Sequence, residues 1–365
     1  MLRVLAFGLL AAAALTANPA SAGALDPVLA TALNGTHVPA VGALLIRDGK
    51  VSQIAVHGIR EIGHPDAVRQ DDLWQLCSDT KPMTAALILR LVEQHRLSLD
   101  TPLSATMPDL AAKARPEYRE TTLRELLHHM AGLPHDSSDI ARAFPASFHD
   151  TRPVPEQRLA YLATALNDAP VAPPGKEAHY SNTGFLLAAA IAEHATGVSY
   201  EALMQHEIFA PLHMTTARFG PPGENRGHHN GLVATAEDDI PTMFDPAGGV
   251  SASLADWAKF CIDQLAGAKG HGRLLTAQSY RLMQSPDAAT GNGLSWGFDA
   301  TFMDRQGPML SHTGSDDSWN SMVVLFPASG NGLLVNTNAG ADMGGEKDGK
   351  AVLKALMPEL APPAK

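Results

Sequence analysis

Strand-like segments occur at both ends of the chain, and helix-like segments fill its middle. Residues 38–45 and 51–59 are rich in β-formers, and Asp48-Gly49 between them is a hairpin-turn signal. The β pattern returns late in the chain, in residues 296–302, 321–326 and 332–336. Segments so far apart can share one sheet. We therefore expect an α/β (α+β) fold, in which a central antiparallel sheet flanked by helices receives an inserted, mainly helical domain.

The helical segments set the expected domain bounds. Residues 80–96 are apolar almost all round, which at this length indicates a buried helix, and Pro82 suits its first turn. The sheet domain is expected to comprise residues 23–99 and 261–365, with the helical domain at 100–260. The other expected helices are residues 122–130, 155–166, 183–196, 254–265 and 347–356, and residues 220–231 form a loop without periodicity.

The first 22 residues have the pattern of a secretory signal peptide. Arg3 supplies the positive end, an apolar run follows, and Ala20-Ser21-Ala22 is a small-residue cleavage site. A membrane anchor is the alternative, but the apolar run is short for a hydrocarbon core. We therefore expect a secreted or periplasmic protein without a stable membrane span.

Charge and cysteine content narrow the expected partners. A formal charge of −11 disfavours binding to nucleic acid, so a small-molecule or peptide substrate is favoured. Cys77 and Cys261 could form a disulfide in an exported chain, but each lies in an apolar run. The sequence favours buried free thiols and leaves the disulfide open.

Two serine motifs compete for the role of nucleophile. Gly293 to Gly297 matches G-x-S-x-G around Ser295, but that motif needs a strand before the serine and a helix after it. A turn-rich segment precedes Ser295 and a strand-like one follows. Ser78-Asp79-Thr80-Lys81 is an S-x-x-K motif at the start of the buried helix, where positions i and i+3 share a face. Burial lowers the pKa of a lysine, so Lys81 could take the proton of the Ser78 hydroxyl.

Two further motifs accompany S-x-x-K: Tyr180-Ser181-Asn182 and His312-Thr313-Gly314. In these elements and their order the chain resembles the serine β-lactamase and penicillin-binding superfamily, specifically its class C β-lactamase, DD-peptidase and esterase branch. The resemblance covers about residues 30 to 340. It extends to the segments Glu125 to Pro134, Pro174-Gly175, Pro211 to Met214, Pro246 to Gly249 and Gly293 to Gly297.

The resemblance implies a β-lactamase/transpeptidase-like fold and roles for the motif residues. Ser78 would be the acylated nucleophile, and Lys81 and Tyr180 the proton-transfer pair. Which of these two is the acylation base stays open. Asn182 would bind Lys81 and the substrate amide.

The resemblance also places the third motif beside the substrate. The backbone N–H groups of Ser78 and Ser315 would form the oxyanion hole. Gly314 would let the substrate approach the strand, and Thr313 would offer a hydroxyl.

His312 stands where many β-lactamases have lysine. An imidazole with an ordinary pKa is mostly neutral at neutral pH, so it would attract a substrate carboxylate less strongly. Asp316 and Asp317 follow the motif closely. We expect them to disfavour anionic substrates and to allow neutral or cationic ones.

The sequence thus predicts a secreted serine hydrolase that acts through an acyl-enzyme on amide or ester bonds, without a cofactor. DD-carboxypeptidase-like, esterase and β-lactamase activities all fit. The first alternative is a non-catalytic module that binds penicillin or cell-wall peptide. The second, a metal-dependent hydrolase, lacks support because neither His128-His129 nor His228-His229 has metal-ligand spacing.

Overall fold

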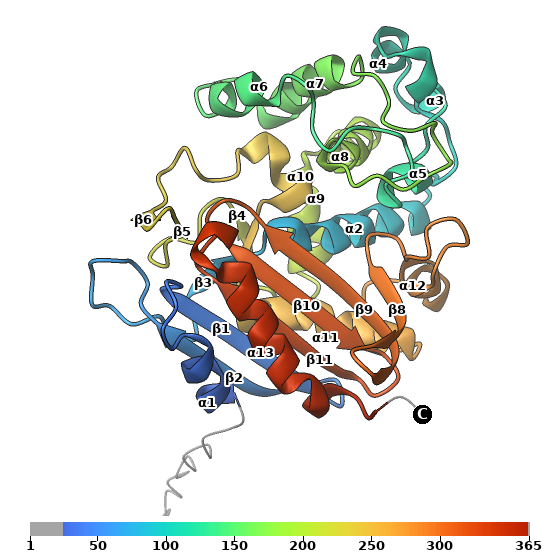
Figure 1. The fold of residues 1–365 in the computed structure, drawn as a ribbon. Helices are drawn as coiled ribbons and strands as arrows, with labels where there is room; N and C mark the ends of the chain where they lie inside the picture. The colour runs from blue at the N-terminus through green and yellow to red at the C-terminus, as the bar shows by residue number, and fades with distance from the viewer. Residues whose placement is uncertain (1–24, 364–365) are drawn as a thin grey trace, which may run out of the picture.

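A six-stranded antiparallel sheet forms the centre of the computed structural model, which describes residues 25–363 (Figure 1). Its strand order is β2-β1-β11-β10-β9-β8, so the N-terminal hairpin pairs with the C-terminal strands. The predicted sheet of distant segments is therefore confirmed. The strands are β1 (Ala40–Arg47), β2 (Lys50–Gly58), β8 (Gly297–Phe302), β9 (Arg305–Ser315), β10 (Asn320–Phe326) and β11 (Asn331–Thr337).

The predicted Asp-Gly turn joins β1 to β2. Asp48 and Gly49 both have positive φ, 50° and 71°, as a two-residue type I′ hairpin turn requires. The other edge of β1 pairs with β11, with Val41 opposite Thr337.

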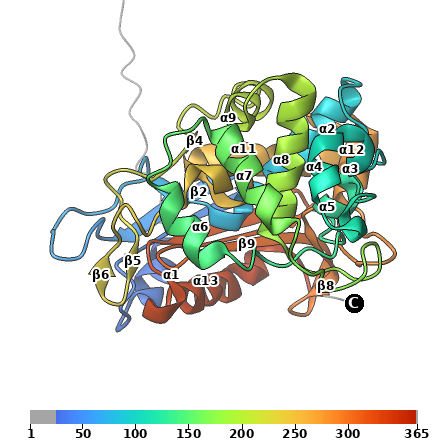
Figure 2. The ribbon, with the colours of Figure 1, turned by 90° about the horizontal axis from the view of Figure 1, so that it is seen from above.

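Helices cover both faces of the sheet (Figure 2). Helices α1 (Leu25–Ala32) and α13 (Gly345–Leu360) lie on one face, and α11 (Leu254–Ala268) lies on the other. Side chains of β1 alternate between the two resulting cores: Val41 packs with α1 and α13, and Leu44 packs in the larger core on the α11 side. This alternation makes β1 buried along nearly its whole length, as expected for a central strand covered on both faces.

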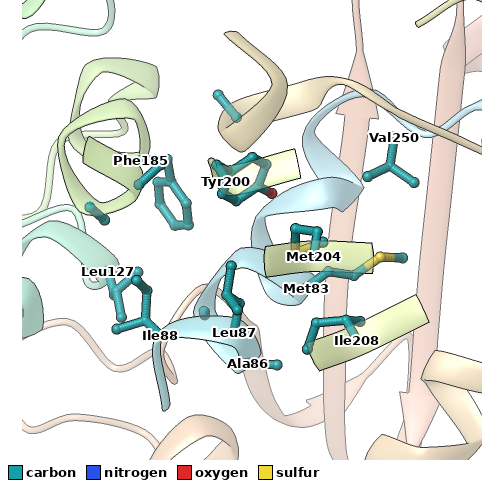
Figure 3. Close-up of a cluster of buried hydrophobic side chains, with 14 of the residues drawn as sticks. Met83, Ala86, Leu87, Ile88, Leu127, Phe185, Tyr200, Met204, Ile208 and Val250 are labelled. Carbon is teal, nitrogen blue, oxygen red and sulfur yellow. The ribbon is translucent and has the colours of Figure 1, made fainter. Parts of the chain in front are cut away.

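The middle of the chain is mainly helical. Helix α2 (Lys81–Glu93) is the predicted buried helix, with Pro82 in its first turn, and the larger core packs around it. In Figure 3, Ile88 of α2 lies beside Leu127, whereas Met83 lies beside Met204 and Ile208. The remaining helices are α3 (Leu103–Thr106), α4 (Pro108–Lys113), α5 (Leu123–Leu127), α6 (Ile140–Ser147), α7 (Val154–Ala165), α8 (Asn182–Thr196), α9 (Tyr200–Met204), α10 (Asp245–Gly248) and α12 (Ala277–Gln284).

Short strands complete the structure. The first group is the sheet β3-β7-β4, and the second is the pair β5 and β6. Their bounds are β3 (Leu73–Gln75), β4 (Arg218–Phe219), β5 (His228–His229), β6 (Leu232–Val233) and β7 (Val250–Ser253).

Several sequence predictions need comment. The predicted domain bounds 23–99, 100–260 and 261–365 stay a prediction, although α11, which crosses the second boundary, packs against the sheet.

The predicted signal peptide, residues 1–22, lies outside the described residues. Helices α1 and α12 and the first half of β9 were not predicted. Among residues 25–363, no helix combines the length and apolar character needed to cross a bilayer.

Candidate active site

Ser78 lies in a 3₁₀ turn, Cys77–Thr80, between β3 and α2. Strand β7 holds this turn from both sides. Val250 accepts a hydrogen bond from the Leu76 N–H at 2.9 Å, and its own N–H donates to Thr80 Oγ1 at 3.1 Å. The Ser78 hydroxyl is thereby fixed at the start of a buried helix, as the S-x-x-K motif predicts.

Lys81 is fully buried and has three oxygen neighbours. Its Nζ donates to the Ala247 carbonyl at 2.7 Å and to Asn182 Oδ1 at 2.8 Å, and it lies 3.0 Å from Ser78 Oγ. The carbonyl and the amide oxygen can only accept. A neutral amine has two N–H groups, so these two acceptors leave its lone pair directed at the Ser78 hydroxyl.

Burial favours that neutral form. Desolvation lowers the pKa of Lys81 to about 7, even though the negative charge of Asp136 acts in the opposite direction. The amine is therefore available as a proton acceptor near neutral pH.

Tyr180 reaches the same hydroxyl from the other side. Its phenol donates to Ser78 Oγ at 2.7 Å, and the Lys81 Nζ lies 4.7 Å from the centre of its ring. Although 39% of the residue surface is exposed, desolvation of the phenol raises the pKa of Tyr180 above its ordinary value. Tyr180 thus keeps its proton at neutral pH and can give it to a departing group.

Two histidines hold the Tyr180 ring. His129 stacks on it at a centroid distance of 4.5 Å, and His135 lies 5.4 Å away, tilted by 31°. His129 Nδ1 accepts from the Ser181 N–H at 3.1 Å, and burial lowers the pKa of His129 to about 3, so its ring is neutral. The sequence showed only that His128-His129 lacks metal-ligand spacing, and the contact of His129 with the tyrosine was not predicted.

Asn182 connects Lys81 to a carboxylate that the sequence did not reveal. Its Nδ2 donates to Asp136 Oδ1 at 3.1 Å, and His135 Nδ1 is 2.5 Å from the other carboxylate oxygen. An ionised carboxylate only accepts hydrogen bonds, so Asp136 fixes which way the Asn182 amide points. The amide oxygen consequently faces Lys81.

At Gly314, strand β9 lies against the turn that carries Ser78. A Cβ added to Gly314 would stand 2.2 Å from the Leu76 carbonyl oxygen and 2.9 Å from the Ser78 nitrogen, so no larger residue fits. Gly314 pairs with Ser321 and Ser315 with Asn320, while the Asp316 N–H donates to Trp319 O at 3.2 Å.

These pairings decide where the Ser315 N–H points. Hydrogen-bonded and non-hydrogen-bonded pairs alternate along an antiparallel ladder, so the Ser315–Asn320 pair is non-hydrogen-bonded. The Ser315 N–H therefore points away from β10. Strand β8 does not reach it, because its first paired residue, Gly297, lies opposite Ser311. The geometry fits the expected oxyanion hole.

His312 is bound to the second residue of the S-x-x-K motif. Its Nδ1 lies 3.0 Å from Asp79 Oδ1, and Ser321 Oγ donates to the other Asp79 oxygen at 2.7 Å. The Asp79 side chain is completely buried. Nδ1 is thus occupied, and Nε2 is the nitrogen left for other contacts. Thr313, next along β9, is exposed, but it lies on the same side of the sheet as Met309, which packs with α13, and it lines neither cavity at Ser78. Its expected hydroxyl contact with the substrate stays a prediction.

The two residues after the H-T-G-S segment differ in their surroundings. Asp316 Oδ1 accepts from the N–H groups of Ser318 and Trp319, and burial raises the pKa of Asp316 to about 6. Its other oxygen lies 3.4 Å from Cys77 Sγ. Asp317 is exposed. Cys77 and Cys261 are both buried and free, as the sequence favoured.

A cavity of ≈390 Å³ opens beside Ser78, with Asn182 and Ser315 on its walls. Its other walls come from the segment around α6, from the residues before α10, and from the end of β9. The cavity therefore lies where the helical segment meets the sheet.

The rejected G-x-S-x-G motif does not form a nucleophile elbow. Ser295 has φ of 64° and is followed by strand β8 rather than a helix. It borders a second cavity of ≈280 Å³, together with Tyr180 and His312. Within residues 25–363, no group of three or more His, Cys, Asp or Glu side chains has the arrangement of a metal site.

Comparisons with known proteins agree with this fold. The chain is 27% identical to penicillin-binding protein 4 of Amycolatopsis lactamdurans over 325 residues, which cover 83% of this chain and 82% of that protein. It is 22% identical to Protein flp of Staphylococcus aureus (strain MRSA252), covering 87% of this chain but only 63% of that relative's length.

A solved structure shares the architecture. The D-stereospecific amidohydrolase from Streptomyces sp. matches with a TM-score of 0.73 at 24% identity, over 92% of this chain and 98% of that one. The family model described as Beta-lactamase matches residues 25–357, which is most of the chain. The protein therefore belongs to the β-lactamase family.

Proposed function

We propose that this protein is a secreted serine hydrolase that cleaves amide or ester bonds through an acyl-enzyme on Ser78. One observation carries the proposal: Ser78 Oγ lies 3.0 Å from a buried lysine amine and 2.7 Å from a tyrosine phenol. A hydroxyl held between a proton acceptor and a proton donor is the arrangement that nucleophilic acyl transfer needs.

The roles of the two groups follow from their environments. Lys81, whose pKa burial lowers to about 7, takes the Ser78 proton as the hydroxyl attacks the carbonyl carbon. The oxyanion that develops is bound by the N–H groups of Ser78 and Ser315. Tyr180, with its raised pKa, gives its proton to the leaving amine or alcohol and is then reprotonated from Lys81. Water hydrolyses the Ser78 ester and regenerates the hydroxyl.

Substrates are proposed in the order D-amino-acid peptides or related amides, small esters, and β-lactams. The relative called a penicillin-binding protein and the neighbour called a D-stereospecific amidohydrolase both support this range. His312 supports the lower rank of β-lactams, since it stands where many β-lactamases have a lysine. The proposed location outside the cytoplasm rests on residues 1–22 and is tested by the N-terminal sequence of the mature chain.

The test uses two probes that modify a reactive serine. Purified mature protein and Ser78→Ala are incubated with a fluorescent penicillin and a fluorophosphonate, and the adduct is located by peptide mass. We expect labelling at Ser78 and hydrolysis of an ester or amide that the alanine variant lacks. A wild-type chain that neither probe labels, or an alanine variant with full activity, would refute the mechanism. Stable labelling without turnover of any ester, amide or cephalosporin would instead indicate the binding module.

The acidic residues after H-T-G-S give a separate test of substrate charge. We propose that Asp316 and Asp317 disfavour anionic substrates. Replacing both with Asn should improve hydrolysis of an anionic ester relative to a neutral one, and an unchanged ratio would rule this role out.

A further inference from the structure

Two cavities meet at the Ser78–Tyr180 hydrogen bond, and their linings differ in charge. The acidic cavity is the one of ≈390 Å³ beside Ser78, whose walls include five carboxylates: Asp136, Glu237, Asp238, Asp316 and Asp317. The imidazole cavity is the one of ≈280 Å³ beside Tyr180, whose walls include His128, His129 and His312 and no carboxylate. The 2.7 Å hydrogen bond from Tyr180 to Ser78 joins them.

The proposed chemistry decides which half of a substrate enters each cavity. The carbonyl carbon must lie at Ser78 Oγ, with its oxygen toward the N–H groups of Ser78 and Ser315. The leaving atom must meet a proton donor, and Tyr180 borders the imidazole cavity but not the acidic one. The leaving half therefore extends into the imidazole cavity, and the acyl half occupies the acidic cavity.

The lining of the acidic cavity describes the acyl group that it fits. No lysine or arginine is among its lining residues within the described part of the chain. Lys81 lies nearby but is not among the lining residues, and because burial lowers its pKa to about 7 it carries only a partial positive charge near neutral pH. Apolar side chains form much of the remaining wall: Ile140, Phe144, Ile240 and Phe244. Such a cavity fits an apolar group that also carries a positive charge.

Two of the five carboxylates are free to bind that charge. Asp136, Asp238 and Asp316 each accept hydrogen bonds from neighbouring protein groups. The side chains of Glu237 and Asp317 have no hydrogen bond or ion pair with any residue between 25 and 363. A ligand ammonium can therefore pair with them without displacing a protein contact.

We infer, on the basis of the proposed Ser78 chemistry, that the substrate is an amide or ester of an amino acid with a free amino group and an apolar side chain. Glu237 and Asp317 bind its ammonium group. Ser78 Oγ forms an ester with the aminoacyl carbonyl carbon, the C–N or C–O bond breaks, and the leaving group takes the Tyr180 proton. Water then releases the free amino acid.

The experiment compares matched substrates with the purified mature chain. Both enantiomers of phenylalanine p-nitroanilide and their N-acetyl counterparts differ in the charged amine but present the same leaving group. We expect kcat/KM to favour the free amine by about tenfold or more when the amine is protonated. This preference should fall as salt screens the carboxylates, and as pH rises through the pKa of the substrate amine.

Variants assign the preference to particular side chains. Glu237→Gln combined with Asp317→Asn should reduce the ratio of free-amine to acetylated kcat/KM about tenfold. Asp71→Asn is the matched control: it removes an exposed carboxylate that lines neither cavity, and it should leave the ratio unchanged.

The outcomes separate this inference from the proposed function. A preference for the acetylated substrate, or a ratio that the double variant leaves unchanged, overturns the inference. The inference is also overturned if Ser78 reacts with the fluorophosphonate but the chain hydrolyses neither free-amine anilide. In all three cases the proposed nucleophile stands. A chain whose Ser78 no probe or substrate modifies refutes the proposed function, and the inference fails with it.

Discussion

Replacing Asp136 with asparagine should move the pH at which Ser78 becomes reactive. Asp136 is joined to Lys81 through the Asn182 amide, by hydrogen bonds of 3.1 and 2.8 Å. Its charge stabilises the ammonium form and so raises the pKa of Lys81 against the larger effect of burial. An Asn at position 136 can still accept from Asn182 Nδ2, so the substitution mainly removes the charge.

The size of the effect follows from Coulomb's law. Two hydrogen bonds and one amide group put the charges of Asp136 and Lys81 roughly 7 Å apart, and an effective dielectric constant of ~20 then gives roughly 2 kcal/mol. Solvent screening reduces this in the partly open cleft, leaving a fall in the Lys81 pKa of about one pH unit, or ~1.4 kcal/mol. Losing a negative charge disfavours the ammonium, so the neutral amine persists to lower pH.

The assay is the second-order rate of Ser78 modification by a fluorophosphonate across pH. Wild-type protein should lose reactivity as pH falls through about 7, where Lys81 becomes charged. In Asp136→Asn this acid limb should lie about one pH unit lower. Asp139→Asn is the control, because Asp139 lies on the same segment and pairs with Arg142, outside this network. An acid limb that stays in place or moves to higher pH in Asp136→Asn would refute the assignment of Lys81 as the base.

Three further substitutions test other parts of the structure. Gly314→Ala should abolish Ser78 labelling, because the added Cβ would stand 2.2 Å from Leu76 O, and circular dichroism should show that the variant still folds. Retained labelling would contradict the close approach of β9. Ser295→Gly should raise the free energy of unfolding in urea by about 1 kcal/mol, because φ of 64° suits glycine and the buried hydroxyl has no partner within residues 25–363. A loss of stability would show that the hydroxyl is bound. Arg158→Met should lower the free energy of unfolding by about 3–5 kcal/mol, because it leaves the buried Glu193 and its neighbour Glu201 without their cation. A change below about 1 kcal/mol would contradict that pairing.

The sequence predicted those parts of the site that local geometry determines. Ser78 and Lys81 are three residues apart at a helix start, so one turn of backbone brings their side chains together. Asn182 is the first residue of α8 and Tyr180 lies two residues before it, and their motif was recognised through the family resemblance. The fold was also predicted from local signals, because the hairpin around Asp48-Gly49 and the late strands have clear β patterns in the sequence.

Contacts made only by the tertiary structure could not be predicted. Asp136 is 46 residues from its partner Asn182, and no spacing marks it as part of the site. Ala247 contributes a backbone carbonyl, which any residue possesses, so its side chain gives no signal. The first half of β9 was missed because Arg305 to Pro308 contains no β-branched residue and is largely solvent-facing, which weakens the alternation typical of strands.

Asp79 explains how S-x-x-K and H-T-G act as one unit. Its buried carboxylate binds His312 Nδ1 through one oxygen and Ser321 Oγ through the other, and Ser321 Oγ also lies 2.7 Å from the Leu76 carbonyl oxygen. The turn that carries Ser78 is thereby joined to β9 and β10. The N–H groups that we propose bind the oxyanion belong to that turn and to Ser315, so the same contacts fix the distance between them. Preorganised donors of this kind act on charge that develops only in the transition state. In the proposed mechanism, Asp79 would therefore contribute to the rate without touching the substrate.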